Sequence, residues 1–171
     1  MKKFCITGVS GTGKSSVIEE LKKRGIDAFD IDSMEGLCHW RDETLGKRVE
    51  YYPGVGKEWL DKHYYFCDTK KLKEIMDGCD GAVVVSGLAS NQEEFLALFD
   101  KVFLFHCDEK IFLHRLDTRE NHDFAKDKSE QEHVLGYYKE FENEMREYGA
   151  VPIDTNAPLN NIVDKIISEI C

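Results

Sequence analysis

A glycine-rich turn near the start of the chain carries the clearest chemical signal in the sequence. Residues 8–15 read GVSGTGKS, which matches the phosphate-binding pattern GxxxxGK[ST] in full. Glycines let the backbone wrap closely so that its amides converge on an anion, and the lysine adds a mobile cation. The serine after the lysine offers a hydroxyl to Mg²⁺, which prefers hard oxygen ligands. The pattern therefore predicts a loop that holds nucleotide phosphates together with Mg²⁺.

The turn also has the surroundings that the pattern requires. An apolar run at 3–7 predicts a strand before it, and apolar residues at helical spacing over 14–24 predict a helix after it. The start of that helix adds unpaired N–H groups and the positive end of its dipole. The full match disfavours a chance glycine turn that merely caps a helix. We expect the nucleotide to contact Gly8, Ser10, Gly11, Thr12, Gly13, Lys14, Ser15 and Ser16.

Two aspartates follow the second predicted strand, residues 27–31. Asp30 and Asp32 stand at its carboxyl end, where open α/β sheets place their ligands. Alternation along the strand is expected to put both carboxylates on one face. Such a carboxylate can orient a nucleophilic hydroxyl and accept its proton, or it can simply cap the next turn. We expect a functional role for Asp32, and for Asp30 the two interpretations stay open.

The apolar pattern alternates strands and helices along the whole chain. Predicted strands lie at 3–7, 27–31, 82–85, 101–106 and 150–153. This alternation predicts one α/β domain over residues 1–171 with a doubly wound parallel sheet. Capping-box patterns at Ser90–Glu93 and Ser129–Glu132 predict where two of the helices begin. Residues 33–81 are too many for a compact connection, so we expect a functional insertion there.

Aromatic side chains interleaved with basic residues mark this insertion. It holds both tryptophans of the chain, and Trp40, Arg41 and Arg48 are candidates for binding a second substrate. Aromatic faces can stack on a base, and arginine can hold a phosphate or a carboxylate. The alternative is a small satellite core with surface arginines, because aromatic residues often build such cores.

Composition limits the class of protein. The chain has 171 residues, of which 42% are hydrophobic and 33% are charged, as in a globular domain. Its formal net charge of −10 disfavours a broad nucleic-acid surface. No apolar run approaches the roughly 20 residues that span a bilayer, and the first one is too short for a signal peptide. We therefore predict a cytoplasmic protein without a membrane partner, as a monomer or a homodimer.

Six cysteines are spread over the chain without a CxxC pair. This usage favours a reduced protein over a disulfide framework. A zinc site is an alternative for four residues of the insertion, although their spacing matches no recognised zinc pattern. Packed cysteines and surface histidines are the preferred interpretation of these four residues, which are Cys38, His39, His63 and Cys67.

Together these motifs resemble the small P-loop kinases related to nucleoside monophosphate kinases, shikimate kinase and gluconate kinase. The resemblance rests on the loop at 8–15, on Asp-Ile-Asp at 30–32, on an arginine-bearing segment after the fourth strand and on residues 153–159. It covers nearly the whole chain, although 33–81 matches weakly. It implies a three-layer fold with a five-stranded parallel sheet in the order 2-3-1-4-5. It further implies a short lid at about 119–128, and Mg-ATP as the phosphoryl donor.

Catalytic roles follow from the same resemblance. Lys14 would reach the β- and γ-phosphates, and Ser15 would bind Mg²⁺ with help from Asp32 or Ser86 through water. Asp32 resembles the shikimate kinase aspartate that engages the acceptor hydroxyl. Arg115 and Arg119, four residues apart on one helix face, would project toward the lid and stabilise the transferring phosphoryl group. The alternative for both arginines is a solvated charged face.

The remaining site residues also depend on the resemblance. Asn156 and Pro158 belong to the loop that packs on adenine in these kinases, and ATP rather than GTP is expected for that reason alone. A plain helix start, with Asn156 as its cap, is compatible with that role. The third strand ends Val85-Ser86-Gly87, without the aspartate that often supports Mg²⁺ there. Gly87 and Asp30 are expected to line the acceptor pocket.

The leading interpretation is therefore a small-molecule kinase. It would move the γ-phosphoryl group of Mg-ATP to a hydroxyl or phosphate of a small molecule, with a nucleoside or nucleotide favoured slightly by the aromatic residues. Polyols and hydroxy acids stay open as acceptors. The alternatives are a kinase-like ATPase that acts on a protein partner and a nucleotide-binding module. Asp32 together with the two arginines favours transfer over binding alone.

Overall fold

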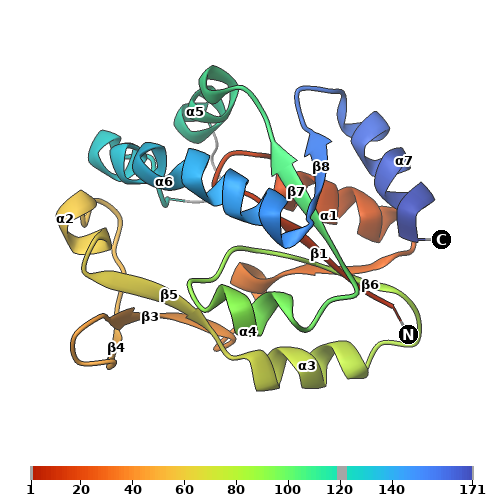
Figure 1. Ribbon diagram of the computed structural model, residues 1–171, viewed down its shortest axis with the longest axis horizontal. Coiled ribbons are helices and arrows are strands. Elements are labelled where there is room, and N and C mark those ends of the chain that lie inside the picture. The colour runs from red at the N-terminus through yellow and green to blue at the C-terminus, as the bar shows by residue number, and fades with distance from the viewer. Residues whose placement is uncertain (1, 119–122, 171) are drawn as a thin grey trace.

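The computed structural model describes residues 2–118 and 123–170 and has a five-stranded parallel sheet at its centre (Figure 1). The strands lie in the order β2-β6-β1-β7-β8. Counted along the chain, these five strands have the predicted order 2-3-1-4-5. The strands of this sheet are β1 (Lys3–Thr7), β2 (Asp27–Asp30), β6 (Val83–Ser86), β7 (Lys101–His106) and β8 (Val151–Asp154).

Helices cover both faces of this sheet, which gives the predicted three layers. Alternate residues of β1 show the division, because Phe4 and Ile6 pack with α1 and α7, whereas Cys5 packs with the helices of the other face. Strand β6 is buried along its whole length, as expected for a central parallel strand. No helix in the described ranges is long and apolar enough to cross a membrane. The covering helices are α1 (Lys14–Lys23), α3 (Thr69–Asp77), α4 (Gln92–Leu96), α5 (Glu109–Thr118), α6 (Lys128–Tyr148) and α7 (Leu159–Ile170).

The insertion forms a second sheet that the sequence analysis did not predict. Its three antiparallel strands lie in the order β4-β3-β5, and Figure 1 shows them beside the main sheet, with α2 facing the first turns of α6. Trp40 stands opposite Tyr65 in the register of β3 and β5. The elements of the insertion are β3 (Cys38–Asp42), β4 (Arg48–Val49), α2 (Lys57–Leu60) and β5 (His63–Cys67).

Both predicted capping serines have other partners. Helix α6 is capped by Asp127, whose carboxylate accepts from the Ser129 amide at 2.8 Å. The Ser129 hydroxyl instead accepts from the Lys57 amide at 3.3 Å, and the Ser90 hydroxyl accepts from the Tyr65 amide at 3.1 Å. The helices begin close to the predicted positions. Their serines, however, serve contacts with the insertion, which a local pattern cannot reveal.

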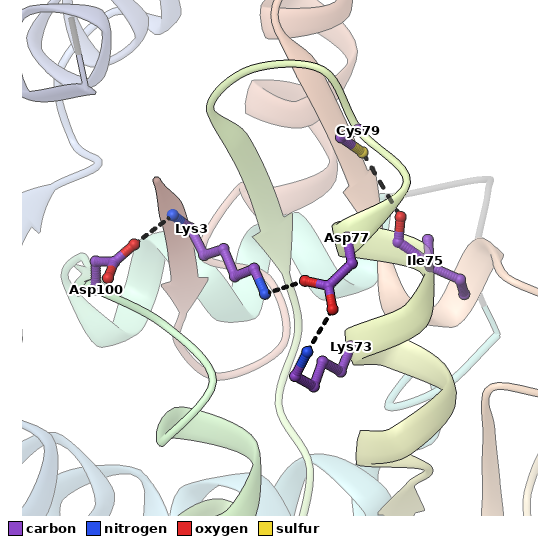
Figure 2. Close-up of polar contacts among 6 residues, drawn as sticks. All are labelled: Lys3, Lys73, Ile75, Asp77, Cys79 and Asp100. Atoms are coloured by element: carbon purple, nitrogen blue, oxygen red, sulfur yellow. Dashed lines mark hydrogen bonds and ion pairs between the residues drawn. The ribbon is translucent and has the colours of Figure 1, made fainter. Parts of the chain in front are cut away.

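Polar contacts at the first residue of β1 connect it to two other segments (Figure 2). The Lys3 amide donates to Asp100 Oδ2 at 2.7 Å, and the Lys3 ammonium lies 2.5 Å from Asp77 Oδ1 at the end of α3. Lys73, one turn earlier on α3, contacts the other Asp77 oxygen. The hydrogen bonds from Lys3 and then Lys73 lower the pKa of the Asp77 carboxyl below its ordinary value.

The lowered pKa of Asp77 predicts a pH-dependent contribution to stability. A carboxyl with a depressed folded-state pKa stabilises the fold above its unfolded pKa of about 4, and this contribution is lost as the pH falls through the folded value. Asp77→Asn should therefore unfold at a lower temperature than the wild type at about pH 7, with a difference that shrinks as the pH falls below about 4. Thermal unfolding followed by circular dichroism across this range checks the prediction. A difference that is independent of pH would contradict it.

Candidate active site

The phosphate-binding loop connects β1 to α1. Gly11 and Gly13 have φ angles of 87° and 94°, which side chains other than glycine rarely adopt. A Cβ at Gly11 would also lie 2.7 Å from the carbonyl oxygen of Phe112, so the loop packs against α5 too closely for a side chain. Helix α1 begins at Lys14 with Gly13 as its N-cap. Because glycine has no capping side chain, the first amides of α1 are available to an anion.

The residues of the loop differ in whether they line the neighbouring cavity. The Lys14 ammonium donates to the carbonyls of Gly8 at 2.6 Å and Val9 at 3.1 Å, which are the first two residues of the loop. Thr12 is buried and donates its hydroxyl to the Val9 carbonyl at 2.8 Å, so this side chain stabilises the loop itself. Ser16 is exposed on α1. The loop residues that line the neighbouring cavity are Gly8, Ser10, Gly11, Lys14 and Ser15.

Asp30 connects this loop to two strands of the sheet. Its Oδ2 accepts hydrogen bonds from the hydroxyls of Ser15 at 3.1 Å and Ser86 at 2.8 Å. Its Oδ1 accepts from the Asp32 amide at 3.1 Å, and the residue is only 9% exposed. Asp30 is therefore the carboxylate beside Ser15, the residue expected at Mg²⁺. It stands in β2, and Ser86 of β6 supports it at the position where an aspartate is missing.

Asp32 lies in the short 3₁₀ helix η1 (Ile31–Ser33), so the expected strand alternation ends at Asp30. The two carboxylates nevertheless line the same cavity. Asp32 Oδ1 accepts from the Tyr65 hydroxyl at 2.7 Å. Burial, and then the charge of Asp32, raise the pKa of Tyr65 far above its ordinary value, so this phenol stays protonated and keeps donating. Tyr65 belongs to the aromatic insertion, but its sequence position alone did not predict this contact with Asp32.

Gly87 lies behind the turn that carries Asp32. A Cβ at this position would lie 2.3 Å from Cδ1 of Ile31, which is fully buried. Gly87 therefore leaves room for Ile31, and it is not among the residues that line the cavity. The structure gives this glycine a supporting position behind the site, where the sequence analysis expected it on the pocket wall.

A cavity of about 850 Å³ opens beside the phosphate loop and extends to the insertion. The Trp40 ring packs with those of Tyr65, Trp59 and Tyr51, at centroid distances of 5.2, 5.3 and 5.9 Å. The aromatic residues thus form a satellite core and a cavity wall at once. The aromatic side chains that line the cavity are Trp40, Tyr51, Tyr65, Phe124, Tyr137 and Phe141.

Arg41 and Arg48 are not part of this wall. They stand opposite each other in β3 and β4, and strand alternation puts them on the other face of the small sheet from Trp40. The Arg41 guanidinium lies 3.7 Å from the centroid of the Phe66 ring, and Arg48 is exposed. The structure therefore brings Trp40 to the cavity and leaves both predicted arginines outside it.

Arg115 lies beside the phosphate loop. Its Nη2 donates to the Thr155 carbonyl at 2.8 Å, and its Nη1 is 3.7 Å from the point where a Cβ of Gly13 would lie. The side chain thus bridges α5 and the loop after β8, where the sequence analysis expected it to project toward the lid. Arg119 and the rest of 119–122 lie outside the described residues.

The loop between β8 and α7 contains the two residues expected near adenine. The Asn156 side chain accepts from the Asp108 amide at 3.2 Å, just before α5, so it does not act as the cap of α7. Pro158 immediately precedes α7. Both residues are exposed, and neither lines the cavity. This loop is held next to Arg115 and thus close to the phosphate loop.

Within residues 2–118 and 123–170, no group of three or more His, Cys, Asp or Glu side chains is arranged to hold a metal ion. Cys38 and Cys67 face each other across β3 and β5 as free thiols. His63 stacks on Trp59 at a centroid distance of 3.9 Å. These residues pack within the small sheet and its surroundings.

A sequence profile of the AAA domain family matches residues 5–136, which include the phosphate loop, both aspartates and the insertion. The chain belongs to this family. No curated protein matches the chain closely enough to count as a relative.

Solved structures of small kinases resemble this chain over almost its whole length. A gluconokinase from Sinorhizobium meliloti 1021 is 20% identical in sequence. The match covers 99% of this chain and 91% of the gluconokinase chain, with a TM-score of 0.57. A deoxyadenosine kinase from M. mycoides with bound dATP is 14% identical over 98% of both chains, with a TM-score of 0.58. A shikimate kinase from Aquifex aeolicus vf5 is 15% identical in sequence. The match covers 98% of this chain and 95% of the shikimate kinase chain, with a TM-score of 0.51. The predicted resemblance to small P-loop kinases is confirmed as a shared fold.

The supporting position of Gly87 predicts a stability effect. Gly87→Ala should destabilise the fold by about 1–3 kcal/mol, because the added methyl overlaps Ile31. Gly136 on α6 offers a control, since a Cβ there meets nothing within 4 Å. Gly136→Ala should stabilise the protein by roughly 0.5–1 kcal/mol through helix propensity. Urea unfolding of the two variants checks both effects, and an unchanged midpoint for Gly87→Ala would contradict the assigned role.

Proposed function

We propose that this protein is an ATP-dependent phosphotransferase that moves the γ-phosphoryl group of Mg-ATP to a small-molecule acceptor. The single observation that carries the proposal is that Asp32 shares a cavity with Lys14 and Ser15 of the phosphate loop. A loop that only binds a nucleotide needs no oriented carboxylate on its far side. A kinase does, because the acceptor oxygen must be oriented for attack and relieved of its proton.

The described residues fit Mg-ATP. Uncapped amides of α1, the backbone of the glycine-rich loop and the Lys14 ammonium suit a chain of phosphates. The Ser15 hydroxyl and the Asp30 carboxylate, 3.1 Å apart, supply the oxygen donors that Mg²⁺ prefers. We therefore assign Asp30 to the magnesium position together with Ser15. The choice of ATP over GTP follows the resemblance to the small kinases.

Each side chain would then have a defined task. Lys14 would exchange the carbonyls of Gly8 and Val9 for phosphate oxygens, and Arg115, beside Gly13, would stabilise negative charge on the nucleotide side. Tyr65 fixes the orientation of Asp32 through its 2.7 Å hydrogen bond. Asp32 would accept the proton of the acceptor hydroxyl as the oxygen attacks the phosphoryl group.

The acceptor is proposed to lie against the aromatic wall. Trp40 and Tyr65 come from the two paired strands of the insertion, and Tyr65 also contacts Asp32. An acceptor with a planar ring could stack on this wall while its hydroxyl reaches Asp32. The Gln92 side chain lines the same cavity and offers an amide for hydrogen bonds. Nucleosides and nucleotides are therefore the first acceptors to test, followed by polyols and sugar acids.

Turnover of ATP with a panel of acceptors tests the proposal. We expect one class among nucleosides, nucleotides, polyols and sugar acids to stimulate turnover, and Asp32→Asn to reduce the stimulated rate by about 10²–10⁴-fold. Lys14→Ala should lose ATP binding and turnover together. Asp27→Asn, an exposed position at the start of β2, is the matched control and should behave as the wild type.

Two results would contradict the proposal. If no acceptor raises turnover and Asp32→Asn leaves the basal rate unchanged, the protein is better described as a kinase-like ATPase or a binding module. If Lys14→Ala retains turnover, the phosphate-site assignment fails.

A further inference from the structure

A buried carboxylate lies behind the aromatic wall, and no step of the proposed reaction uses it. Glu130 stands in the first turn of α6 and is 0% exposed. Burying an ionised carboxylate is costly unless polar partners satisfy it. The position at the start of a helix lowers this cost, because the positive end of the helix dipole favours an anion. The remaining compensation comes from hydrogen bonds.

Glu130 accepts hydrogen bonds from two separate segments. The Tyr51 hydroxyl lies 3.3 Å from each carboxylate oxygen, and the Gly54 amide donates to Oε1 at 3.1 Å. Both donors belong to the connection between β4 and α2. The Ala125 amide donates to Oε2 at 2.8 Å from the segment between α5 and α6. Each of these partners donates, so the Glu130 carboxylate acts only as an acceptor in this arrangement.

Side chains of α6 hold the backbone of Ala125 at both its amide and its carbonyl. Ala125 is fully buried and has a φ of 59°, a left-handed conformation that residues other than glycine rarely adopt. Glu130 accepts from its amide, and the Gln131 side chain donates to its carbonyl at 3.2 Å. The same Gln131 amide donates to Asp117 at the end of α5, at 2.7 Å. Neighbouring side chains of α6 therefore maintain a strained turn that would otherwise relax.

The position of the turn determines where Phe124 lies. Phe124 directly precedes Ala125, lines the cavity, and packs on Tyr51 and Trp40 at centroid distances of 6.0 and 6.3 Å. Tyr51 is itself bound to Glu130 through its hydroxyl. One carboxylate thus holds two segments that contribute to the aromatic wall, the connection that carries Tyr51 and the segment that carries Phe124.

We propose that Glu130 is a positioning residue that couples these two segments and keeps the aromatic wall in one arrangement before any acceptor binds. A wall that is ordered in advance spends less binding energy on ordering when the acceptor arrives. The role of the wall as an acceptor site rests on the proposed function. The coupling between the two segments does not, and it is measurable without an acceptor.

Hydrogen exchange of the full chain, followed by mass spectrometry, tests the coupling. Glu130→Gln keeps the shape of the side chain but places an amide where a carboxylate accepts from N–H groups. Exchange at Gly54 and Ala125 should both accelerate by about tenfold or more, whereas β1 and α1 should not change. The affinity for fluorescent mant-ATP should stay within about twofold of the wild-type value. Glu132→Gln, an exposed position on the same helix, is the matched control and should match the wild type.

Tyr51→Phe provides a second, milder variant that keeps the aromatic ring. It removes one donor from the insertion side and should still accelerate exchange at Ala125, on the other side of Glu130. Combined with Glu130→Gln, it should add little further acceleration there, because the connecting group is already gone.

Three outcomes would overturn the proposal. In the first, Tyr51→Phe accelerates exchange only around its own position. In the second, the effects of the two substitutions at Ala125 add fully. In the third, exchange rises throughout the fold or mant-ATP affinity falls in parallel, which would give Glu130 a general structural role. A failure of the panel to reveal an acceptor would leave all of these results interpretable, so the two proposals can fail separately.

Discussion

The buried carboxylate of Asp30 is the constraint on which the site depends. Strand β2 does not touch β1 in the sheet, because β6 lies between them. Asp30 reaches across this gap, since it accepts from Ser86 of β6 and from Ser15 at the start of α1. The same carboxylate accepts from the Asp32 amide and so fixes the turn that follows β2. Three segments that are far apart in the sequence thus acquire one geometry, and hydrogen bonds to a charged acceptor make that geometry comparatively strong.

The remaining parts of the site depend on this arrangement. The insertion supplies Tyr65, which holds the Asp32 carboxylate from the opposite side. It also supplies Trp40 and Tyr51, which build the cavity wall together with Phe124. Arg115 and the loop after β8 approach the phosphate loop from the other direction. In the proposed reaction, the parallel sheet would position the nucleotide and the small antiparallel sheet would position the acceptor.

Local patterns predicted the parts of the molecule that local forces determine. The phosphate loop and the strands of the main sheet depend on glycine conformations and on the burial of continuous apolar runs, which are visible in short segments. The order of the strands followed from the resemblance carried by the same motifs. The alternation expected for Asp30 and Asp32 failed because the chain leaves β2 after Asp30 and enters a 3₁₀ turn.

Contacts between distant segments could not be predicted in the same way. Tyr65 and Asp32 are 33 residues apart, and Tyr51 and Glu130 are 79 residues apart, so no spacing rule connects them. Ser90 and Ser129 fit a helix-capping pattern, but their hydroxyls accept hydrogen bonds from backbone amides of the insertion instead. Arg41 and Arg48 were predicted at the acceptor because the insertion was not recognised as a sheet. Once β3 is known, alternation alone separates them from Trp40.

The Mg²⁺ dependence of nucleotide binding tests the central role of Asp30 most directly. Fluorescent mant-ATP is titrated into the wild type, Asp30→Asn and the control Asp27→Asn, each with Mg²⁺ and with a chelator. Because Asp30 is assigned to the magnesium position with Ser15, the wild type and the control should bind more tightly with Mg²⁺, and Asp30→Asn should lose most of that difference. An Asp30→Asn variant that is folded by circular dichroism and keeps the full Mg²⁺ dependence would contradict the account.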